Sequence, residues 1–119
     1  ASYQSVSGAG RAGQEELKSQ LKSWLEQSSP ATPQTFPHPI ALNCIPQIGS
    51  FNEQGFCSEE MKVMQETKKI LGEPTLRVSA FTVRVPSWNA HSEAVWIRLK
   101  KKVSREEIVK SLQAQAGLA

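Results

Sequence analysis

A neighbouring arginine and histidine are the side chains in this sequence best suited to chemistry on a small acidic molecule. Arg84 and His91 lie near the two ends of the segment VRVPSWNAH, residues 83–91. A guanidinium is a planar fork of donors that fits a carboxylate or a phosphate. An imidazole can transfer a proton near neutral pH. The pair predicts anion binding and proton transfer if both face one substrate. The alternative is a surface ion pair for Arg84 and a backbone hydrogen bond for His91.

Two expected strands would position this pair. Residues 76–85 (LRVSAFTVRV) are rich in β-branched residues and alternate in hydrophobicity, which favours a strand. Pro86 has no backbone donor and ends this strand. Residues 91–99 (HSEAVWIRL) are expected to form a second strand, and residues 86–90 have the length of a hairpin loop. A hairpin would bring Arg84 and His91 to one rim of a sheet.

The remaining elements are helices and short strands. Helical periodicity and capping predict helices at residues 14–27, 58–71 and 104–115, with short strands at residues 1–7 and 40–45. The proline-rich residues 28–39 read as a connection. This order predicts an α+β fold, a mixed and mostly antiparallel sheet with helices packed on one face.

The apolar residues of the first two helices are expected to face the core. In residues 14–27 they lie at helical spacing, and in residues 58–71 two methionines and a terminal Ile-Leu pair form the expected buried side. The residues concerned are Leu17, Leu21, Trp24 and Leu25 in the first helix, and Met61, Met64, Ile70 and Leu71 in the second. Ser58 is the expected N-cap of the second helix.

Three smaller features stay open between a structural and a functional role. Glu59 and Lys62 share a helix face, where a surface ion pair is the simpler interpretation. The small residues 8–10 could let a phosphate or a ring approach the backbone, although a plain turn is favoured. Cys44 lies in an apolar run, IALNCIP, and is expected to be a small core residue.

Composition limits the class of protein. The 119 residues are 39% hydrophobic, which suits one domain with a single core. A net charge of +3 is mild, and the triplet at residues 100–102 reads as a solvated strand end, so no nucleic-acid partner is expected. No apolar run is long enough for a bilayer and no leader is visible, so no membrane partner is expected. Two irregularly placed cysteines predict neither disulfides nor a metal site, and a cytoplasmic location is expected.

Five segments together resemble one enzyme family. SYQSVSGAGRAGQEEL, FPHPIALNCIP, EEMKVMQETKKILG, VSAFTVRVP and AHSEAV, in this order, are similar to the C-terminal domain of bacterial aspartate-β-semialdehyde dehydrogenase. The resemblance implies a fold like the C-terminal domain of glyceraldehyde-3-phosphate-dehydrogenase-like enzymes. It also implies the NADPH-dependent reductive dephosphorylation of aspartyl phosphate to aspartate semialdehyde, on the route to lysine, methionine and threonine. The implied partners are this substrate pair, phosphate and a second subunit in a homodimer.

The resemblance also implies substrate-binding roles for individual residues. Gln4 matches the glutamine that helps to position the acyl substrate. Glu59 and Lys62 match the pair near the substrate amino group and the phosphate. Arg84 resembles the arginine that binds the substrate carboxylate.

For catalysis and the cofactor, the resemblance singles out three more residues. His91 resembles the general acid–base residue that handles the proton at the thiohemiacetal stage. Ser7 and Gly8 match the Ser-Gly that contacts the NADP cofactor near its nicotinamide.

The printed chain lacks other parts of the family pattern. The family's nucleophilic cysteine and its nucleotide-binding domain are expected to precede residue 1. Asn43-Cys44 mimics only the first two letters of the Asn-Cys-Ser/Thr nucleophile segment. Residues 1–119 are therefore expected to be the substrate-binding and dimerisation domain, which should not turn over alone. Trp96 and Phe81 are candidates for a surface covered by the absent domain or the second subunit, with core burial as an equal alternative.

Two rival functions follow from the same resemblance. One is a non-catalytic dimerisation or assembly module of the same fold. The other is a related acyl-phosphate or acyl-CoA reductase with a different substrate.

Overall fold

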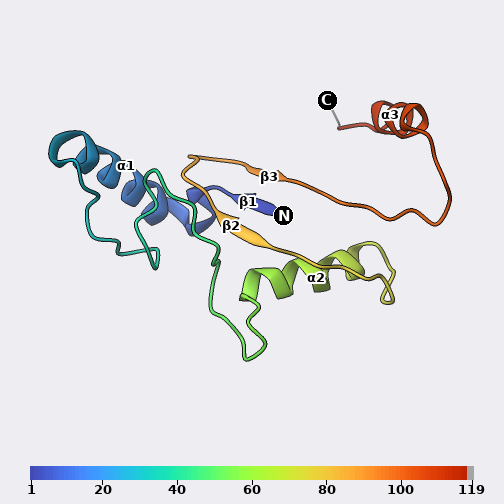
Figure 1. Ribbon diagram of the computed structural model, residues 1–119, viewed down its shortest axis with the longest axis horizontal. Coiled ribbons are helices and arrows are strands. Elements are labelled where there is room, and N and C mark those ends of the chain that lie inside the picture. Colours follow the sequence, from blue (N-terminus) through green and yellow to red (C-terminus); the bar gives the residue numbers. More distant parts are fainter. Residues whose placement is uncertain (118–119) are drawn as a thin grey trace.

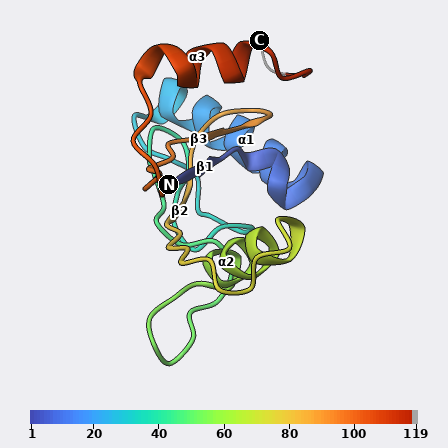
Figure 2. The same ribbon diagram turned by 90° about the vertical axis from the view of Figure 1, so that its right-hand side faces the viewer.

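The computed structural model describes residues 1–117 and shows three helices and a three-stranded mixed sheet (Figure 1). The expected α+β class is confirmed. In chain order the elements are β1 (Ser2–Gln4), the 3₁₀ helix η1 (Val6–Ala9), α1 (Gly10–Gln27), α2 (Ser58–Ile70), β2 (Thr82–Arg84), β3 (His91–Glu93) and α3 (Arg105–Gln113). Seen along the strands, α2 and the start of α1 lie on the same side of the sheet (Figure 2).

The first strand, β1, occupies the centre of the sheet. The strand order is β2-β1-β3, with β1 parallel to β2 and antiparallel to β3. The expected hairpin between the last two strands is therefore wrong, because β1 separates them. The two strands run in opposite directions, as they would in a hairpin, but they are not neighbours in the sheet. Both strands are also shorter than expected, with three residues each.

The connection between β2 and β3 crosses the end of β1. The peptide N–H of Val6 donates to the carbonyl of Ser87 at 3.0 Å, and the side-chain amide of Gln14 donates to Asn89 Oδ1 at 2.8 Å. Two strand spacings are about 10 Å, which the expected loop, residues 86–90, can span. The loop is thus fixed to η1 and α1, on the side where β1 ends.

Helix α1 begins earlier than expected and buries a different face. Gly10, which joins η1 to α1, has a φ of 68°, a conformation that suits glycine. The buried face includes Leu17, but Leu21 and Leu25 are exposed, so the expected apolar stripe is only partly correct. The remaining buried positions of the helix are Gly13, Glu16 and Gln20.

Two of these buried residues are polar because they hold the proline-rich connection. The carboxylate of Glu16 accepts the peptide N–H groups of Gln34 and Thr35. The side-chain oxygen of Gln20 accepts those of Ile40 and Ala41, at 2.7 and 3.0 Å. Buried backbone donors need such partners. The core lies between this connection and the start of the chain and consists of Val6, Leu17, Phe36, Ile40, Ala41 and Ile45.

The expected strand at residues 40–45 is wrong. The peptide N–H of Asn43 donates to the Ile40 carbonyl, and Leu42 has a φ of 58°, so the chain turns here. Only Ile45 pairs with the sheet, through two backbone hydrogen bonds to Arg84 of 2.8 and 2.9 Å. Cys44 is exposed, so its expected place in the core is also wrong.

Helix α2 is attached to the sheet through its first turn. Cys57, not Ser58, is the N-cap, and the carboxylate of Glu60 accepts the Cys57 N–H at 3.0 Å. The same carboxylate accepts the N–H of Thr82 in β2 at 3.2 Å. The C-terminal end of the helix is solvent-exposed, and Ile70 there is 80% exposed. The expectation that Ile70 and Leu71 are buried is therefore wrong within this chain.

Helix α3 stands apart from the other elements (Figure 1). It has the expected capping box, in which Ser104 and Glu107 exchange hydrogen bonds of 2.8 and 3.2 Å. The Ser104 N–H, and after it the Ser104 hydroxyl at 2.9 Å, donate to the Glu107 carboxylate and lower the pKa of Glu107. No residue of α3 is buried, and it is joined to β3 by an extended segment. No helix within residues 1–117 is long and apolar enough to cross a membrane.

Candidate active site

A row of three polar side chains crosses the sheet where its central strand ends. Gln4 of β1 is paired with Arg84 of β2 on one side and with His91 of β3 on the other. Residues that pair directly across neighbouring strands point to the same face. The three side chains therefore share one face, with Gln4 in the middle. The fold brings together the arginine and the histidine that the sequence singled out, through β1 and not through a hairpin.

Arg84 is the most constrained member of this row. Its side chain is 7% exposed, and Nη1 donates to the carbonyl of Ser5 at 2.8 Å. The guanidinium carbon lies 5.7 Å from the centre of the Phe36 ring, which favours a cation. Burial lowers the pKa of Arg84, and the negative charge of Glu59 opposes this effect. Within residues 1–117 the guanidinium donates this one hydrogen bond, and the rest of its five N–H donors have no protein partner there.

His91 has an orientation fixed by one hydrogen bond. Its Nδ1 accepts the peptide N–H of Ser5 at 3.2 Å, and the Ser5 hydroxyl oxygen lies 3.4 Å from the same nitrogen. Within residues 1–117, Nε2 has no hydrogen-bond partner. Since His91 is exposed, this nitrogen can meet a ligand.

The first turn of α2 places an acidic side chain, Glu59, and a basic one, Lys62, beside the row. The side-chain amide of Gln4 donates to Glu59 Oε1 at 3.2 Å, and Lys62 Nζ lies 3.8 Å from Glu59 Oε2. Glu59 is half-buried and Lys62 exposed. The hydrogen bonds of Glu60 to Cys57 and Thr82 fix this turn against β2. The Glu59–Lys62 pair is thus linked to Gln4 as well as being a pair on the helix surface.

Gly8 approaches both functional side chains of the outer strands. A Cβ atom on Gly8 would lie 2.7 Å from Arg84 Nη1 and 3.7 Å from His91 Cε1. Ser7 precedes it, with its hydroxyl 2.7 Å from that of Ser5. All seven residues to which the sequence assigned site roles therefore lie in one cluster: Gln4, Ser7, Gly8, Glu59, Lys62, Arg84 and His91.

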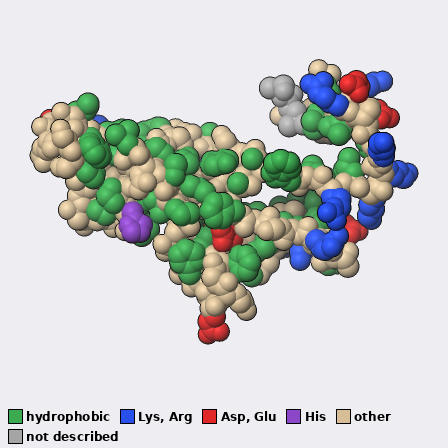
Figure 3. All heavy atoms as spheres, in the orientation of Figure 1, with side chains coloured by type: hydrophobic (Ala, Val, Ile, Leu, Met, Phe, Trp, Pro, Cys, Tyr) green, Lys and Arg blue, Asp and Glu red, His purple; other side chains and the backbone are tan. Residues whose placement is uncertain are grey.

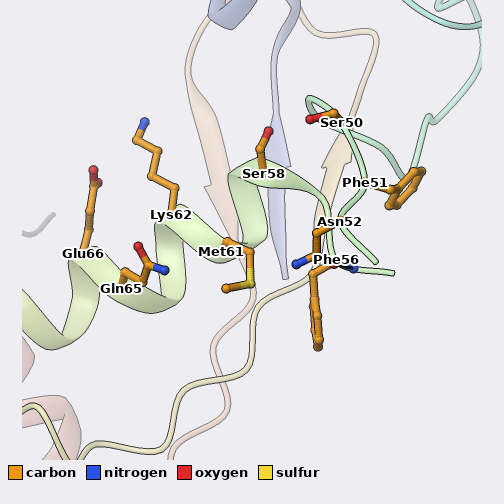
Figure 4. Close-up of a pocket in the computed structure, with 9 residues that line it drawn as sticks. All are labelled: Ser50, Phe51, Asn52, Phe56, Ser58, Met61, Lys62, Gln65 and Glu66. Atoms are coloured by element: carbon orange, nitrogen blue, oxygen red, sulfur yellow. Dashed lines mark hydrogen bonds between the residues drawn. The ribbon is translucent and has the colours of Figure 1, made fainter. Parts of the chain in front are cut away.

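A hollow adjoins this cluster on the side of α2. It has a volume of about 370 Å³ and lies between α2 and the loop that precedes it (Figure 4). Phe51, Phe56 and Met61 contribute apolar surface to it, and Lys62 is also among its lining residues. Only Lys62 belongs to both the hollow and the cluster. We place the site at the cluster because complementary charges and a proton carrier meet there.

Sequence reasoning missed two members of the site. Ser5 provides backbone partners for both Arg84 and His91, and Phe36 lies against the guanidinium. Ser5 lies inside the strand expected at residues 1–7, so nothing in the sequence distinguished it. Phe36 gave no signal either, since it lies in an aperiodic connection. Among the described residues, no group of three or more His, Cys, Asp or Glu side chains could hold a metal ion.

Comparison with known families decides where this chain belongs. Residues 1–119 match the family model described as semialdehyde dehydrogenase, dimerisation domain. The chain belongs to this family. The resemblance drawn from the five sequence segments is thereby confirmed.

Characterised members of the family are similar along nearly the whole chain. Aspartate-semialdehyde dehydrogenase from Aquifex aeolicus is 41% identical over 116 residues, which cover 98% of this chain and 34% of the relative. Aspartate-semialdehyde dehydrogenase 2 from Vibrio cholerae is 42% identical over 116 residues, with the same coverage of 98% and 34%. The chain thus spans about a third of the length of these semialdehyde dehydrogenases.

Solved structures of the family have the same fold. Aspartate semialdehyde dehydrogenase II from Vibrio cholerae, complexed with ASA, superposes with a TM-score of 0.93 at 42% identity, covering 98% of this chain and 34% of that one. The enzyme from Francisella tularensis gives a TM-score of 0.85 at 28% identity, covering 96% and 37%. The α+β fold is therefore that of the semialdehyde dehydrogenases.

Proposed function

We propose that residues 1–119 form the substrate-binding and dimerisation part of an aspartate-semialdehyde dehydrogenase. The complete enzyme reduces aspartyl phosphate to aspartate semialdehyde with NADPH and releases phosphate, on the route to lysine, threonine and methionine. The observation that supports this most strongly is the row in which Gln4 is flanked by Arg84 and His91 and donates to Glu59. This row combines groups for a carboxylate, an ammonium and a proton transfer.

Each charged group of the substrate has a complementary partner at this row. In the proposal, Arg84 binds the α-carboxylate with the donors that Ser5 leaves free. The carboxylate of Glu59 binds the α-ammonium group, and Lys62 binds phosphate. Gln4 positions the acyl group between them, while His91 holds or releases a proton at Nε2. Opposite charges fixed in advance lower the cost of orienting the substrate.

The NADP cofactor of the proposed enzyme fits the surface beside Gly8. Gly8 has no side chain to cover its backbone and is exposed, so a flat ring can approach it there. Ser7 adds a hydroxyl close by. When bound, the cofactor supplies or accepts the hydride. Ser7 and Gly8 hold its nicotinamide end, and Gly8 leaves Arg84 and His91 in place behind it.

We further propose that this part does not turn over alone. In the proposal, the nucleophilic cysteine and the nucleotide-binding domain belong to the two-thirds of the relatives' length that this chain does not span. The thiols of Cys44 and Cys57 are both free, which agrees with a proposed cytoplasmic location.

An assay of the complete protein tests the proposed reaction. Aspartate semialdehyde, phosphate and NADP⁺ should give aspartyl phosphate and NADPH, followed by NADPH absorbance. Omission of phosphate should abolish the signal. If the protein instead requires coenzyme A, it is an acyl-CoA reductase, and if it dimerises but binds neither aspartate semialdehyde nor phosphate, it is a non-catalytic assembly module.

Gly8→Ala should impair the complete enzyme without an overall loss of fold. The added methyl group would lie 2.7 Å from Arg84 Nη1, so the guanidinium must move. A displacement of about 1 Å can cost roughly 100-fold in rate. We expect kcat/KM for aspartate semialdehyde to fall by about 10- to 100-fold while the melting temperature changes little. A kcat/KM within twofold of the wild-type value would show that this close approach is unimportant.

The opposite face of the sheet is the proposed dimer surface. Tyr3 and Phe81 alternate away from the Gln4 row, and they are 41% and 53% exposed. Beyond β3, Trp96 is 97% exposed. Hydrophobic side chains line the sheet and the segment after β3 (Figure 3). Exposed apolar surface of this extent marks an interaction site. The two expected candidates, Trp96 and Phe81, are thus exposed in this chain.

Trp96→Glu should weaken the dimer of the complete protein. Tryptophans at interface centres commonly contribute 2 kcal/mol or more, so the dimer Kd should rise at least about 30-fold. Sedimentation equilibrium measures this change. Trp88→Glu, which alters a half-exposed tryptophan of the loop after β2, is the matched control and should leave the Kd unchanged. An unaltered Kd in the Trp96 variant would remove this segment from the interface.

A further inference from the structure

The backbone of Ser5 contacts the side chains of both Arg84 and His91, which lie on the two outer strands. Its N–H donates to His91 Nδ1 at 3.2 Å, and its carbonyl accepts Arg84 Nη1 at 2.8 Å. β1 ends at Gln4 and η1 begins at Val6, so Ser5 lies between two hydrogen-bonded elements. Ser5 is completely buried. Buried backbone groups need partners, and here the two side chains supply them, together with the N–H of Gly8, which donates to the Ser5 carbonyl at 3.2 Å.

We propose that Ser5 is a positioning residue whose N–H sets the tautomer of His91 and whose carbonyl orients Arg84. The expected effect of Ser5 on catalysis rests on the proposed function, whereas the tautomer of His91 and the orientation of Arg84 do not depend on it. Ser5 is not among the site residues that the sequence predicted.

The tautomer follows from the direction of the hydrogen bond. A peptide N–H can only donate, so His91 Nδ1 must offer its lone pair. The neutral ring therefore carries its proton on Nε2, the nitrogen that has no partner within residues 1–117. Towards the substrate, the resting ring is then a hydrogen-bond donor and not a base. A ring protonated on Nδ1 would have its N–H pointing at the N–H of Ser5.

The Ser5 hydroxyl can act as the hydrogen-bond partner of His91 Nδ1 when the imidazole is doubly protonated. Its oxygen lies 3.4 Å from His91 Nδ1 and 2.7 Å from the Ser7 hydroxyl. Because a hydroxyl can donate or accept, its oxygen can accept a hydrogen bond from an Nδ1–H group while its own O–H donates to Ser7. The N–H of Ser5 thus favours the resting tautomer, and its hydroxyl can accept a hydrogen bond from Nδ1 when the ring is doubly protonated.

Histidine-selective ¹⁵N labelling of the complete protein tests the resting tautomer directly. Solid-state ¹⁵N spectra distinguish protonated from unprotonated ring nitrogens, and the missing signals of a His91→Asn sample assign the ring. In the neutral ring we expect an unprotonated Nδ1 and a protonated Nε2. Ser5→Ala, which keeps the N–H, should retain this pattern. A neutral ring protonated on Nδ1 in the wild-type protein would overturn the proposal.

Ser5→Pro removes the N–H together with the hydroxyl, so its comparison with Ser5→Ala, which removes the hydroxyl alone, isolates the effect of the N–H. Ser5 has a φ of −66°, which proline adopts, and Gln4 before it is extended, as proline requires. The proline ring takes the place of the N–H, so the imidazole must leave it. The Nε2–H pattern should be lost, and kcat should fall about 100-fold. KM for aspartate semialdehyde should change much less, because the carbonyl that holds Arg84 remains.

The two variants separate the possible outcomes. An unchanged tautomer in Ser5→Pro would contradict the proposal, whatever the activity. Should that variant not fold, the wild-type and Ser5→Ala spectra still decide the matter. An expected tautomer in a protein without dehydrogenase activity would leave the role of Ser5 intact and overturn the proposed function alone.

Discussion

Replacing Arg84 by lysine in the complete enzyme is expected to raise the KM for aspartate semialdehyde by about 30- to 1,000-fold. Arg84 uses one donor for the Ser5 carbonyl and keeps the others for the substrate carboxylate. Lysine is a single point charge and cannot serve both. The loss of a buried charged hydrogen bond costs about 2–4 kcal/mol, which gives the stated range.

Steady-state kinetics with matched variants check this expectation. Arg77→Lys makes the same chemical change at an exposed position outside the site and should leave the KM unchanged. Arg84→Ala should be at least as severe as Arg84→Lys. An Arg84→Lys enzyme with a wild-type KM would mean that the carboxylate is bound elsewhere.

The second large effect is expected at His91. His91→Asn should lower kcat by about 10²- to 10⁴-fold, because general acid–base catalysis by one side chain contributes that much. Asparagine can still accept the Ser5 N–H with its side-chain oxygen, so the local structure should persist. The KM should therefore change much less than kcat.

The chain offers a control for this experiment in its other histidine. His38 is exposed in the proline-rich connection, away from the residues of the row. His38→Asn should retain kcat within about twofold. If the His91 variant also retained a kcat near the wild-type value, His91 would have no part in proton transfer.

Local sequence signals were sufficient for much of this fold. Helical periodicity and capping signals predicted the second helix at residues 58–71 and the third at residues 104–115. Both helices form at nearly the expected positions. The α+β class follows from the order of elements. These features depend on interactions between residues a few positions apart, which a sequence displays directly.

The strand pairing could not be read in the same way. Residues 83–91 have every local feature of a hairpin, yet β1, some 80 residues earlier, lies between the two strands. Which strands pair depends on long-range contacts that leave no periodic trace. Arg84 and His91 nevertheless share one face of the sheet, because inserting one strand moves them apart by only one strand spacing.

The sequence also failed to predict which positions of the first two helices are buried. Glu16 and Gln20 are buried because backbone donors of the connection need acceptors. Ile70 and Leu71 are exposed because no part of residues 1–117 covers them. A helical or alternating pattern marks which face is apolar, but not what covers it.

The most direct test removes the carboxylate from the substrate instead of the arginine from the protein. 3-Aminopropanal is aspartate semialdehyde without its α-carboxylate, so wild-type and Arg84→Lys enzymes assayed on both compounds form a double-mutant cycle. We predict that Arg84→Lys lowers kcat/KM about 30- to 1,000-fold for aspartate semialdehyde and by less than threefold for 3-aminopropanal. An equal loss on both compounds would contradict the assignment of Arg84, and with it the substrate-binding row.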